Sequence, residues 1–223
     1  MNEKNTLNIL NGQSMYNYFK KHHLDENGEY VPFNEAMCVG EAAAHIFSHE
    51  FIKYRCEAHS ITMEQYKEHT LKPLHALFEN RFSDIILWFD DDMFCQINLL
   101  TLLAYLDQIN YLKKITFNLV GENFKLLQCF NFSVQGYNEI YNQVMINKSI
   151  PQNVDLPVMN NGINLYLEYL KEENDITQYI KTHEDLEKGI LLRALLKTFT
   201  QYGLGDTQYM HLIEKCRNGN VKY

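Results

Sequence analysis

The pattern of apolar and polar residues is clearest between residues 84 and 120. Residues 84–89 form an apolar run, which is typical of a strand covered on both faces of its sheet. Three consecutive aspartates follow, and residues 93–109 then carry apolar side chains at helical spacing. Residues 115–120 form another apolar run. We therefore predict a strand–helix–strand unit with parallel strands, because a helical crossover returns the chain in the same direction.

The residues before this unit show the same kinds of element. Residues 6–10 predict a short strand, and Ser14 is the expected N-cap of the amphipathic helix that follows. Residues 30–33 predict a second strand. Pro32 cannot donate a backbone hydrogen bond, so it limits this strand to an edge of the sheet or places Pro32 at a strand start. Residues 41–58 repeat apolar side chains at helical spacing and predict a helix.

Helical patterns continue on both sides of the central unit. Residues 62–78 predict a helix that begins with a capping box of Thr62 and Gln65 and is broken by Pro73. After a stretch of weak pattern, residues 137–146 predict a short helix. The segment 148–157 contains turn-forming residues and is the expected domain boundary.

The remaining residues predict a helical tail. Its four expected helices lie at residues 158–171, 176–180, 184–202 and 206–216, and Gly203 is placed as a C-cap glycine. The predicted fold class is therefore α/β, with a mostly parallel sheet flanked by helices and followed by a helical C-terminal region. We expect residues 1–150 to form the α/β domain and residues 151–223 the helical tail or subdomain.

Composition narrows the classes of function. The 223 residues carry a formal net charge of −8, which disfavours general binding to nucleic acid. No apolar run reaches the roughly 20 residues that span a bilayer, so a membrane partner is not expected. The five cysteines show no C-x-x-C spacing and indicate reduced thiols. We expect a cytoplasmic protein, with a homodimer through the helical tail as the expected assembly.

Several segments resemble a known family. In chain order they are LNILNGQSM at residues 7–15, FNEAMCVGE at 33–41, FIKYR at 51–55 and LWFDDDMFCQINLL at 87–100. Together they resemble a bacterial family catalogued as domain of unknown function number 1835. The resemblance covers roughly the first 120 residues and implies no named activity or cofactor. It implies that the recurring polar positions are Asn11, Gly12, Glu35, Arg55, Asp92, Gln96 and Asn98.

The strand ends are the expected place for a ligand. In parallel α/β sheets, ligands bind beyond the carboxyl ends of the strands, where helix N-termini converge. Asn11 and Gly12 follow the first strand, and the aspartates follow the strand at 84–89. We therefore expect a pocket for a small anionic ligand, phosphate-like or sugar-like. Its expected ligand-binding residues are Asn11, Gly12, Ser14, Glu35, Arg55 and Asp92.

Two classes of function remain open at this pocket. In an enzyme, Asp92 or Glu35 would be the acid, base or metal ligand, and Arg55 would hold the anion. In a non-catalytic ligand-sensing or interaction module, the helical tail would contact a partner. If there is no pocket, Asp92 only caps the following helix and Asn11-Gly12 is a turn. Gln96 and Asn98 are two residues apart on that helix, so they are expected to face different sites.

Other chemistry has weaker support. The sequence Asp-Asp-Asp contains the Asp-x-Asp pair that binds metal in some transferases, but the pair is too short to be specific. His45, His49 and Cys56 share one helix face, yet His49 and Cys56 lie about two turns apart, roughly 10 Å. A solvated polar face is the preferred interpretation, and no metal site is expected.

Overall fold

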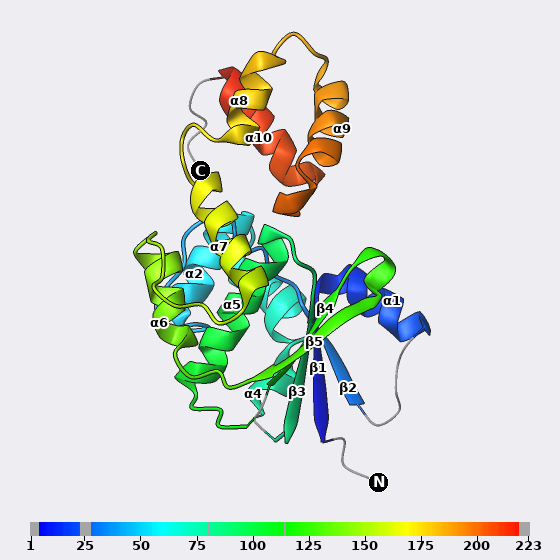
Figure 1. Ribbon diagram of the computed structural model, residues 1–223, viewed down its shortest axis with the longest axis vertical. Helices are drawn as coiled ribbons and strands as arrows, with labels where there is room; N and C mark the ends of the chain where they lie inside the picture. The colour runs from blue at the N-terminus through cyan, green and yellow to red at the C-terminus, as the bar shows by residue number, and fades with distance from the viewer. Residues whose placement is uncertain (1–4, 23–27, 80, 114, 219–223) are drawn as a thin grey trace.

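A five-stranded sheet forms the centre of the computed structural model, which describes residues 5–22, 28–79, 81–113 and 115–218 (Figure 1). The strand order is β2-β1-β3-β4-β5. The first four strands are parallel, and β5 is antiparallel to β4. The strands are β1 (Thr6–Asn11), β2 (Gly28–Phe33), β3 (Asp84–Phe89), β4 (Ile115–Val120) and β5 (Leu126–Phe132). The α/β fold class predicted from the sequence is confirmed.

Helices connect the strands and form the C-terminal region. The α-helices are α1 (Gly12–His22), α2 (His49–His59), α3 (Met63–Tyr66), α4 (His75–Phe78), α5 (Met93–Gln108), α6 (Tyr137–Tyr141), α7 (Pro157–Tyr169), α8 (Asp175–Thr182), α9 (Lys188–Thr198) and α10 (Asp206–Asn218). The described residues also contain two π-helical turns, η1 (Lys67–Leu71) and η3 (Asn142–Ile146), and two 3₁₀ turns, η2 (Glu122–Phe124) and η4 (Thr200–Tyr202). None of the described helices is both long and apolar enough to cross a membrane.

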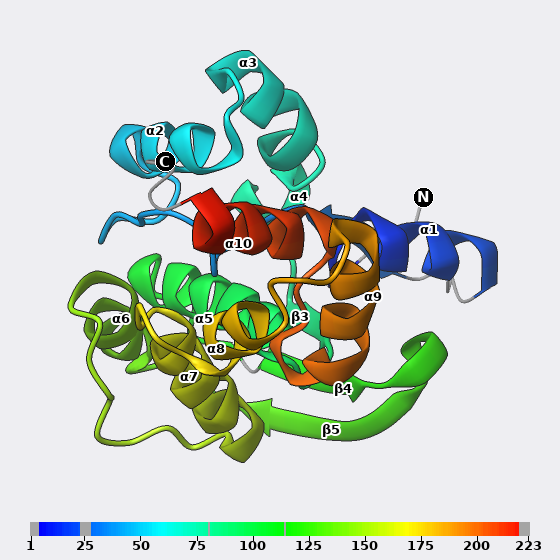
Figure 2. The same cartoon turned by 90° about the horizontal axis from the view of Figure 1, so that it is seen from above.

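The order in which strands are added to the sheet reverses at its centre, although the strands themselves stay parallel. From β1 the chain passes through α1 to β2 on one side, and the later crossover through α5 joins β3 to β4 on the other side. As a consequence, α1 and α5 lie on opposite faces (Figure 2). The carboxyl ends of β1 and β3 are therefore a topological switch point, where ligands commonly bind in open α/β sheets.

Helix α5 forms the middle of the larger core. Twelve of its residues are buried, which explains why its sequence is apolar on nearly every side. It contacts β3 on one side and α6 and α7 on the other. Gly162 of α7 lies so close to α5 that a Cβ there would be 2.5 Å from Cβ of Gln96. The first helix of the predicted tail therefore packs directly on the α/β core.

The opposite face of the sheet is less completely covered than predicted. In β3, Ile85, Leu87 and Phe89 are buried on the α5 side, whereas Ile86 and Trp88 on the α1 side are only half-buried. The expectation that this strand is covered on both faces is thus wrong. A second, smaller apolar cluster occupies that face, and its four buried residues are Leu10, Met15, Phe19 and Val120.

Three predicted helices also have wrong bounds. The helix expected at residues 184–202 is α9, which begins at Lys188 after its N-cap Glu187 and ends at Thr198. Gly12, with φ of +84°, leads directly from β1 into α1, so Ser14 lies inside the first turn and is not its N-cap. The helix expected at residues 41–58 begins only at His49, because Ser48 caps it by accepting a hydrogen bond from Phe51 N at 3.2 Å. Phe47 has φ of +60°, which a right-handed helix cannot include.

Most other sequence predictions are confirmed. Pro32 lies in the edge strand β2, and the capping box of Thr62 and Gln65 begins α3. The helical segment after it is broken near Pro73, between η1 and α4. Gly203 has φ of +64° and ends η4, as expected of a C-cap glycine. Strand β5 falls in the segment of weak pattern and was not predicted.

Candidate ligand-binding site

The predicted residues at the carboxyl ends of β1 and β3 lie close together, but they bond mainly to one another. Asp92 is the N-cap of α5, and its Oδ1 accepts a hydrogen bond from Cys95 N at 2.7 Å. Asn11 donates from Nδ2 to Cys95 Sγ at 2.8 Å. At the switch point, side chains from the end of β1 and the start of α5 thus satisfy each other's hydrogen-bonding groups.

Asn98 extends this network to the segment after β2. Its Nδ2 donates to Asn11 Oδ1 at 2.9 Å and to the Glu35 backbone oxygen at 2.7 Å, and its Oδ1 accepts from Met37 N at 2.9 Å. Gln96 points elsewhere, because its Nε2 donates to the Asp90 backbone oxygen. The prediction that Gln96 and Asn98 face different sites is confirmed.

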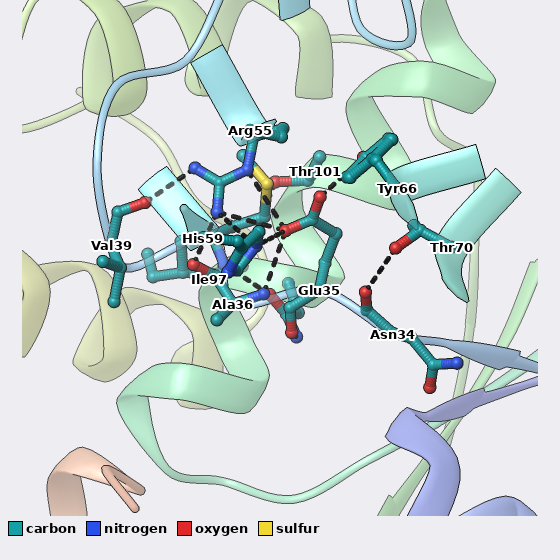
Figure 3. Close-up of polar contacts among 12 residues, drawn as sticks. Asn34, Glu35, Ala36, Val39, Arg55, His59, Tyr66, Thr70, Ile97 and Thr101 are labelled. Atoms are coloured by element: carbon teal, nitrogen blue, oxygen red, sulfur yellow. Dashed lines mark hydrogen bonds and ion pairs between the residues drawn. The ribbon is translucent and has the colours of Figure 1, made fainter. Parts of the chain in front are cut away.

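Glu35, whose backbone oxygen accepts from Asn98, forms a buried ion pair with Arg55. Figure 3 shows this pair and its hydrogen bonds. The guanidinium Nε donates to Glu35 Oε2 at 3.1 Å, and both side chains have 0% exposure. His59 Nε2 lies 3.0 Å from the same carboxylate oxygen. Tyr66 donates its hydroxyl to the other oxygen, Oε1, at 2.6 Å. The carboxylate is therefore surrounded by groups of the protein itself.

The remaining donors of Arg55 are used by the loop that follows β2. Nη1 donates to the backbone oxygens of Val39 and Glu41 at 2.6 and 3.2 Å, and Nη2 donates to that of Ala36 at 2.9 Å. This explains why a loop with few regular hydrogen bonds can be buried, since its carbonyl groups are satisfied by one guanidinium. In this arrangement Arg55 stabilises the fold and presents no donor to an external anion.

The pKa values of Glu35 and Cys95 are consistent with a structural role for both side chains. Burial by itself would raise the pKa of Glu35, but Arg55 and the hydrogen bonds from His59 and Tyr66 outweigh it and lower that pKa to about 2. Glu35 is therefore ionised at neutral pH and does not exchange protons there. Burial raises the pKa of Cys95 well above its ordinary value, so this thiol stays protonated and unreactive.

Asp90, Asp91 and Asp92 lie in a different environment from the Glu35–Arg55 ion pair. Burial raises the pKa of Asp90 to about 6, and it also raises the pKa of Asp92. Asp92 is covered from above by the tail, because Gly203 lies so close that a Cβ there would be 2.3 Å from Asp92 Cγ. Asp91 is exposed. Asp92 thus joins the sheet domain to the tail, in addition to capping α5.

The other predicted positions are peripheral. Gly12 is half-buried and Ser14 is exposed on the first turn of α1. His45 and His49 are exposed as expected, whereas Cys56 is buried, so the three do not share one solvated face. Within the described ranges, no group of three or more histidine, cysteine, aspartate or glutamate side chains could hold a metal ion.

An open hollow lies on the α1 face of the sheet, away from the residues that the sequence singled out. We call it the aromatic groove, and its volume is about 520 Å³. Five of its lining residues are aromatic: Tyr18, Phe19, Tyr30, Trp88 and Phe124. Of the others, Glu122, Asn123 and Lys125 belong to the turn between β4 and β5, and Leu126 is the first residue of β5. The groove therefore lies beside the carboxyl ends of β3 and β4.

The rings of the groove are held by contacts among themselves. Phe19 and Trp88 lie 5.0 Å apart between ring centroids at an interplanar angle of 65°. Tyr18 of α1 meets Phe124 of the turn at 5.1 Å and 69°. Trp88 donates from Nε1 to Asn8 Oδ1 at 3.0 Å, which fixes the indole ring. The helix and the turn thus touch each other across the sheet face.

Some of the aromatic residues that line this groove could be recognised in the sequence. The apolar side of α1 includes Tyr18, and Trp88 is the only tryptophan of the chain. The turn that completes the groove falls in the stretch of weak pattern. Phe124 adopts φ of +56° there, which is uncommon for a bulky residue and has no signature in the local sequence.

Comparison with known proteins adds no family to this description. No protein-family model matches the chain, and no curated protein or solved structure matches it. The resemblance to domain of unknown function number 1835 therefore stays an expectation from the sequence, and the case for a function rests on the residues themselves.

Proposed function

We propose that this chain is a small-molecule-binding protein whose ligand occupies the aromatic groove. The observation that supports the proposal is a hollow of about 520 Å³ lined by five aromatic side chains. Ligand pockets are typically concave, of roughly 300–1,000 Å³, and mostly apolar with a few polar groups at defined places. The groove also lies at the carboxyl side of a mostly parallel sheet, where such ligands commonly bind.

Binding without catalysis is the better supported class. The two carboxylates considered as acid or base are both engaged, because Glu35 is buried in an ion pair and Asp92 caps α5 beneath Gly203. Neither residue lines the aromatic groove. The groove itself offers Glu122 and Lys125 on an exposed turn, and we assign these residues to recognition.

The proposed ligand is an organic molecule with an apolar body. A phosphate-like ligand loses support, because Arg55 is used inside the protein and aromatic rings do not favour an anion. A sugar-like ligand keeps some support, since the C–H face of a sugar ring packs on aromatic rings while its hydroxyl groups reach Glu122 or Asn123.

Trp88 provides a direct test of this proposal. It is the only tryptophan, so its fluorescence reports on the groove alone. We expect at least one member of a panel of sugars, nucleosides, organic acids and organic amines to change the Trp88 emission in a saturable way. The same compound should raise the melting temperature, since it binds only the folded state.

Two substitutions between β4 and β5 and at the start of β5 provide a test variant and its matched control. Phe124→Ala removes a ring from the groove and should weaken binding at least fivefold. Leu127→Ala changes a side chain that is 61% exposed and does not line the groove, so it should leave binding unchanged. The proposal fails if no compound changes the emission, or if both variants bind as the wild type does.

A further inference from the structure

We infer that the ligand of the aromatic groove carries a positively charged ammonium group, with quaternary ammonium as the model case. This inference rests on the proposed function and adds the charge and shape of the ligand. Its first support is the composition of the lining. The faces of aromatic rings carry negative electrostatic potential, so they attract a cation within about 6 Å of the ring centre and repel an anion.

The way Trp88 is held supports contact through its ring. Its indole N–H is already donated to Asn8 Oδ1 at 3.0 Å, and Asn8 is only 3% exposed. The polar edge of the indole is therefore satisfied inside the protein. What Trp88 offers a ligand is its π system, and tryptophan is the side chain that attracts cations most strongly.

The ring geometry fits a tetrahedral group better than a flat one. A planar ligand such as a nucleobase is held best between parallel rings. Here Phe19 and Trp88 meet at 65°, and Tyr18 and Phe124 meet at 69°. Both pairs are edge-to-face contacts of rings that pack on each other, so neither pair leaves a parallel gap for a flat ligand. The ring surfaces that line the groove therefore face different directions, which suits a group with methyl substituents on all sides.

The charged residues of the turn provide a means to test the sign of the ligand charge. Glu122 can act as the counter-charge of an ammonium group, and the whole chain carries a formal net charge of −8. Lys125 lines the same groove and would oppose a cation. A cationic and an anionic ligand must therefore respond in opposite ways when Lys125 loses its charge.

Three probes of the same shape separate charge from size. Tetramethylammonium, tert-butanol and trimethylacetate are compact groups with positive, zero and negative charge. We expect tetramethylammonium to bind at least tenfold more tightly than the other two, measured by Trp88 fluorescence at constant ionic strength. Trp88→Phe, measured by calorimetry, should weaken the binding of tetramethylammonium severalfold.

The turn variants complete the experiment. Lys125→Met should strengthen the binding of tetramethylammonium about two- to fivefold at low salt, and Glu122→Gln should weaken it by a similar factor. Tighter binding of tert-butanol or trimethylacetate, or a reversal of both variant effects, would overturn the inference while leaving the groove as a ligand site. Failure of the proposed function is distinguishable, because then none of the probes and no compound of the wider panel would change the Trp88 emission.

Discussion

Arg55 illustrates how much a single buried side chain can organise. Removing a charge pair from water costs several kcal/mol, and the cost is offset only when the geometry is good and the remaining donors are satisfied. Arg55 meets both conditions, because one guanidinium serves the Glu35 carboxylate and three backbone oxygens. The residue therefore joins α2 to the loop after β2, and its contribution is to the position of that loop.

We predict that Arg55→Met lowers the free energy of unfolding by about 3–5 kcal/mol, because it leaves the buried Glu35 carboxylate without the guanidinium that balances its charge. Urea unfolding followed by circular dichroism measures the change. Lys53→Met on the same helix is the control, since Lys53 is 63% exposed and pairs with Glu57 at 3.9 Å, and its effect should stay within about 0.5 kcal/mol.

The double variant Glu35→Gln/Arg55→Met makes this prediction independent of whether the single variant folds. Replacing both charges removes the unpaired carboxylate, so the double variant should be more stable than Arg55→Met alone. Equal or lower stability of the double variant would contradict the assignment of Arg55 as the partner that compensates Glu35.

The sequence indicated these residues without indicating their arrangement. The family resemblance marked Glu35, Arg55 and Asn98 as recurring polar positions, and an open pocket was the expected setting. The helix predicted at residues 41–58 gave no indication that the Arg55 side chain is fully buried. The reason is that residues 41–48 do not continue the helix, and the loop carbonyls of Val39 and Glu41 instead turn toward the guanidinium.

At the scale of elements, the contact between the tail and the sheet domain depends on the absence of a side chain. Gly203 ends η4 in the left-handed region, and its Cα lies against the carboxylate of Asp92. Asp92 in turn caps α5, which begins at the end of β3. One glycine thus places the tail on the same corner that begins the central helix.

Gly203→Ala should therefore destabilise the protein more than an ordinary glycine substitution. A Cβ at this position would lie 2.3 Å from Asp92 Cγ, and φ of +64° is already unfavourable for alanine. Gly136→Ala is the matched control, because Gly136 has φ of +92° but an added Cβ would meet no described neighbour within 4 Å. We expect Gly203→Ala to cost about 2 kcal/mol more than the control in chemical unfolding. If the two variants lost the same free energy of unfolding, the tail would be able to move away from Asp92 without cost, which would contradict this prediction.

Element boundaries were the least predictable part of this fold. The central strand, its capping aspartate and the long helix follow from a strong local pattern, and the structure reproduces them. β5 was missed because its burial is low along most of its length, so no alternation of apolar and polar residues marks it. The aromatic groove was missed for a related reason, since it depends on a turn that brings Phe124 to Tyr18 across more than 100 residues of chain.

At the scale of the whole molecule, the helical tail and the α/β domain are in direct contact. α7 packs along α5, and Gly203 contacts the corner at Asp92. Within the part of the chain that the structure describes, Ile190 and Leu196 of α9 are 45% and 39% exposed. The homodimer expected through the tail stays a prediction, and these two side chains are where it would be tested.

We predict that the tail and the α/β domain unfold in one cooperative transition. Trp88 reports only on the sheet, whereas far-ultraviolet circular dichroism reports on all helices, including those of the tail. Because the two regions share contacts, both probes should give the same midpoint in urea. An earlier midpoint by circular dichroism would indicate that the tail unfolds independently.

The hydrogen-bonded set around Asn98 also has a consequence for evolution. Asn98, Asn11 and the segment from Glu35 to Met37 come from three separate elements, yet each satisfies polar groups of another. A change of the Asn11 or Asn98 side chain leaves a buried donor or acceptor without a partner, which is costly until a second change compensates. The segment from Glu35 to Met37 contributes backbone groups, which do not depend on its side chains. Among relatives of this chain, Asn11 and Asn98 should therefore covary, being retained together or replaced together.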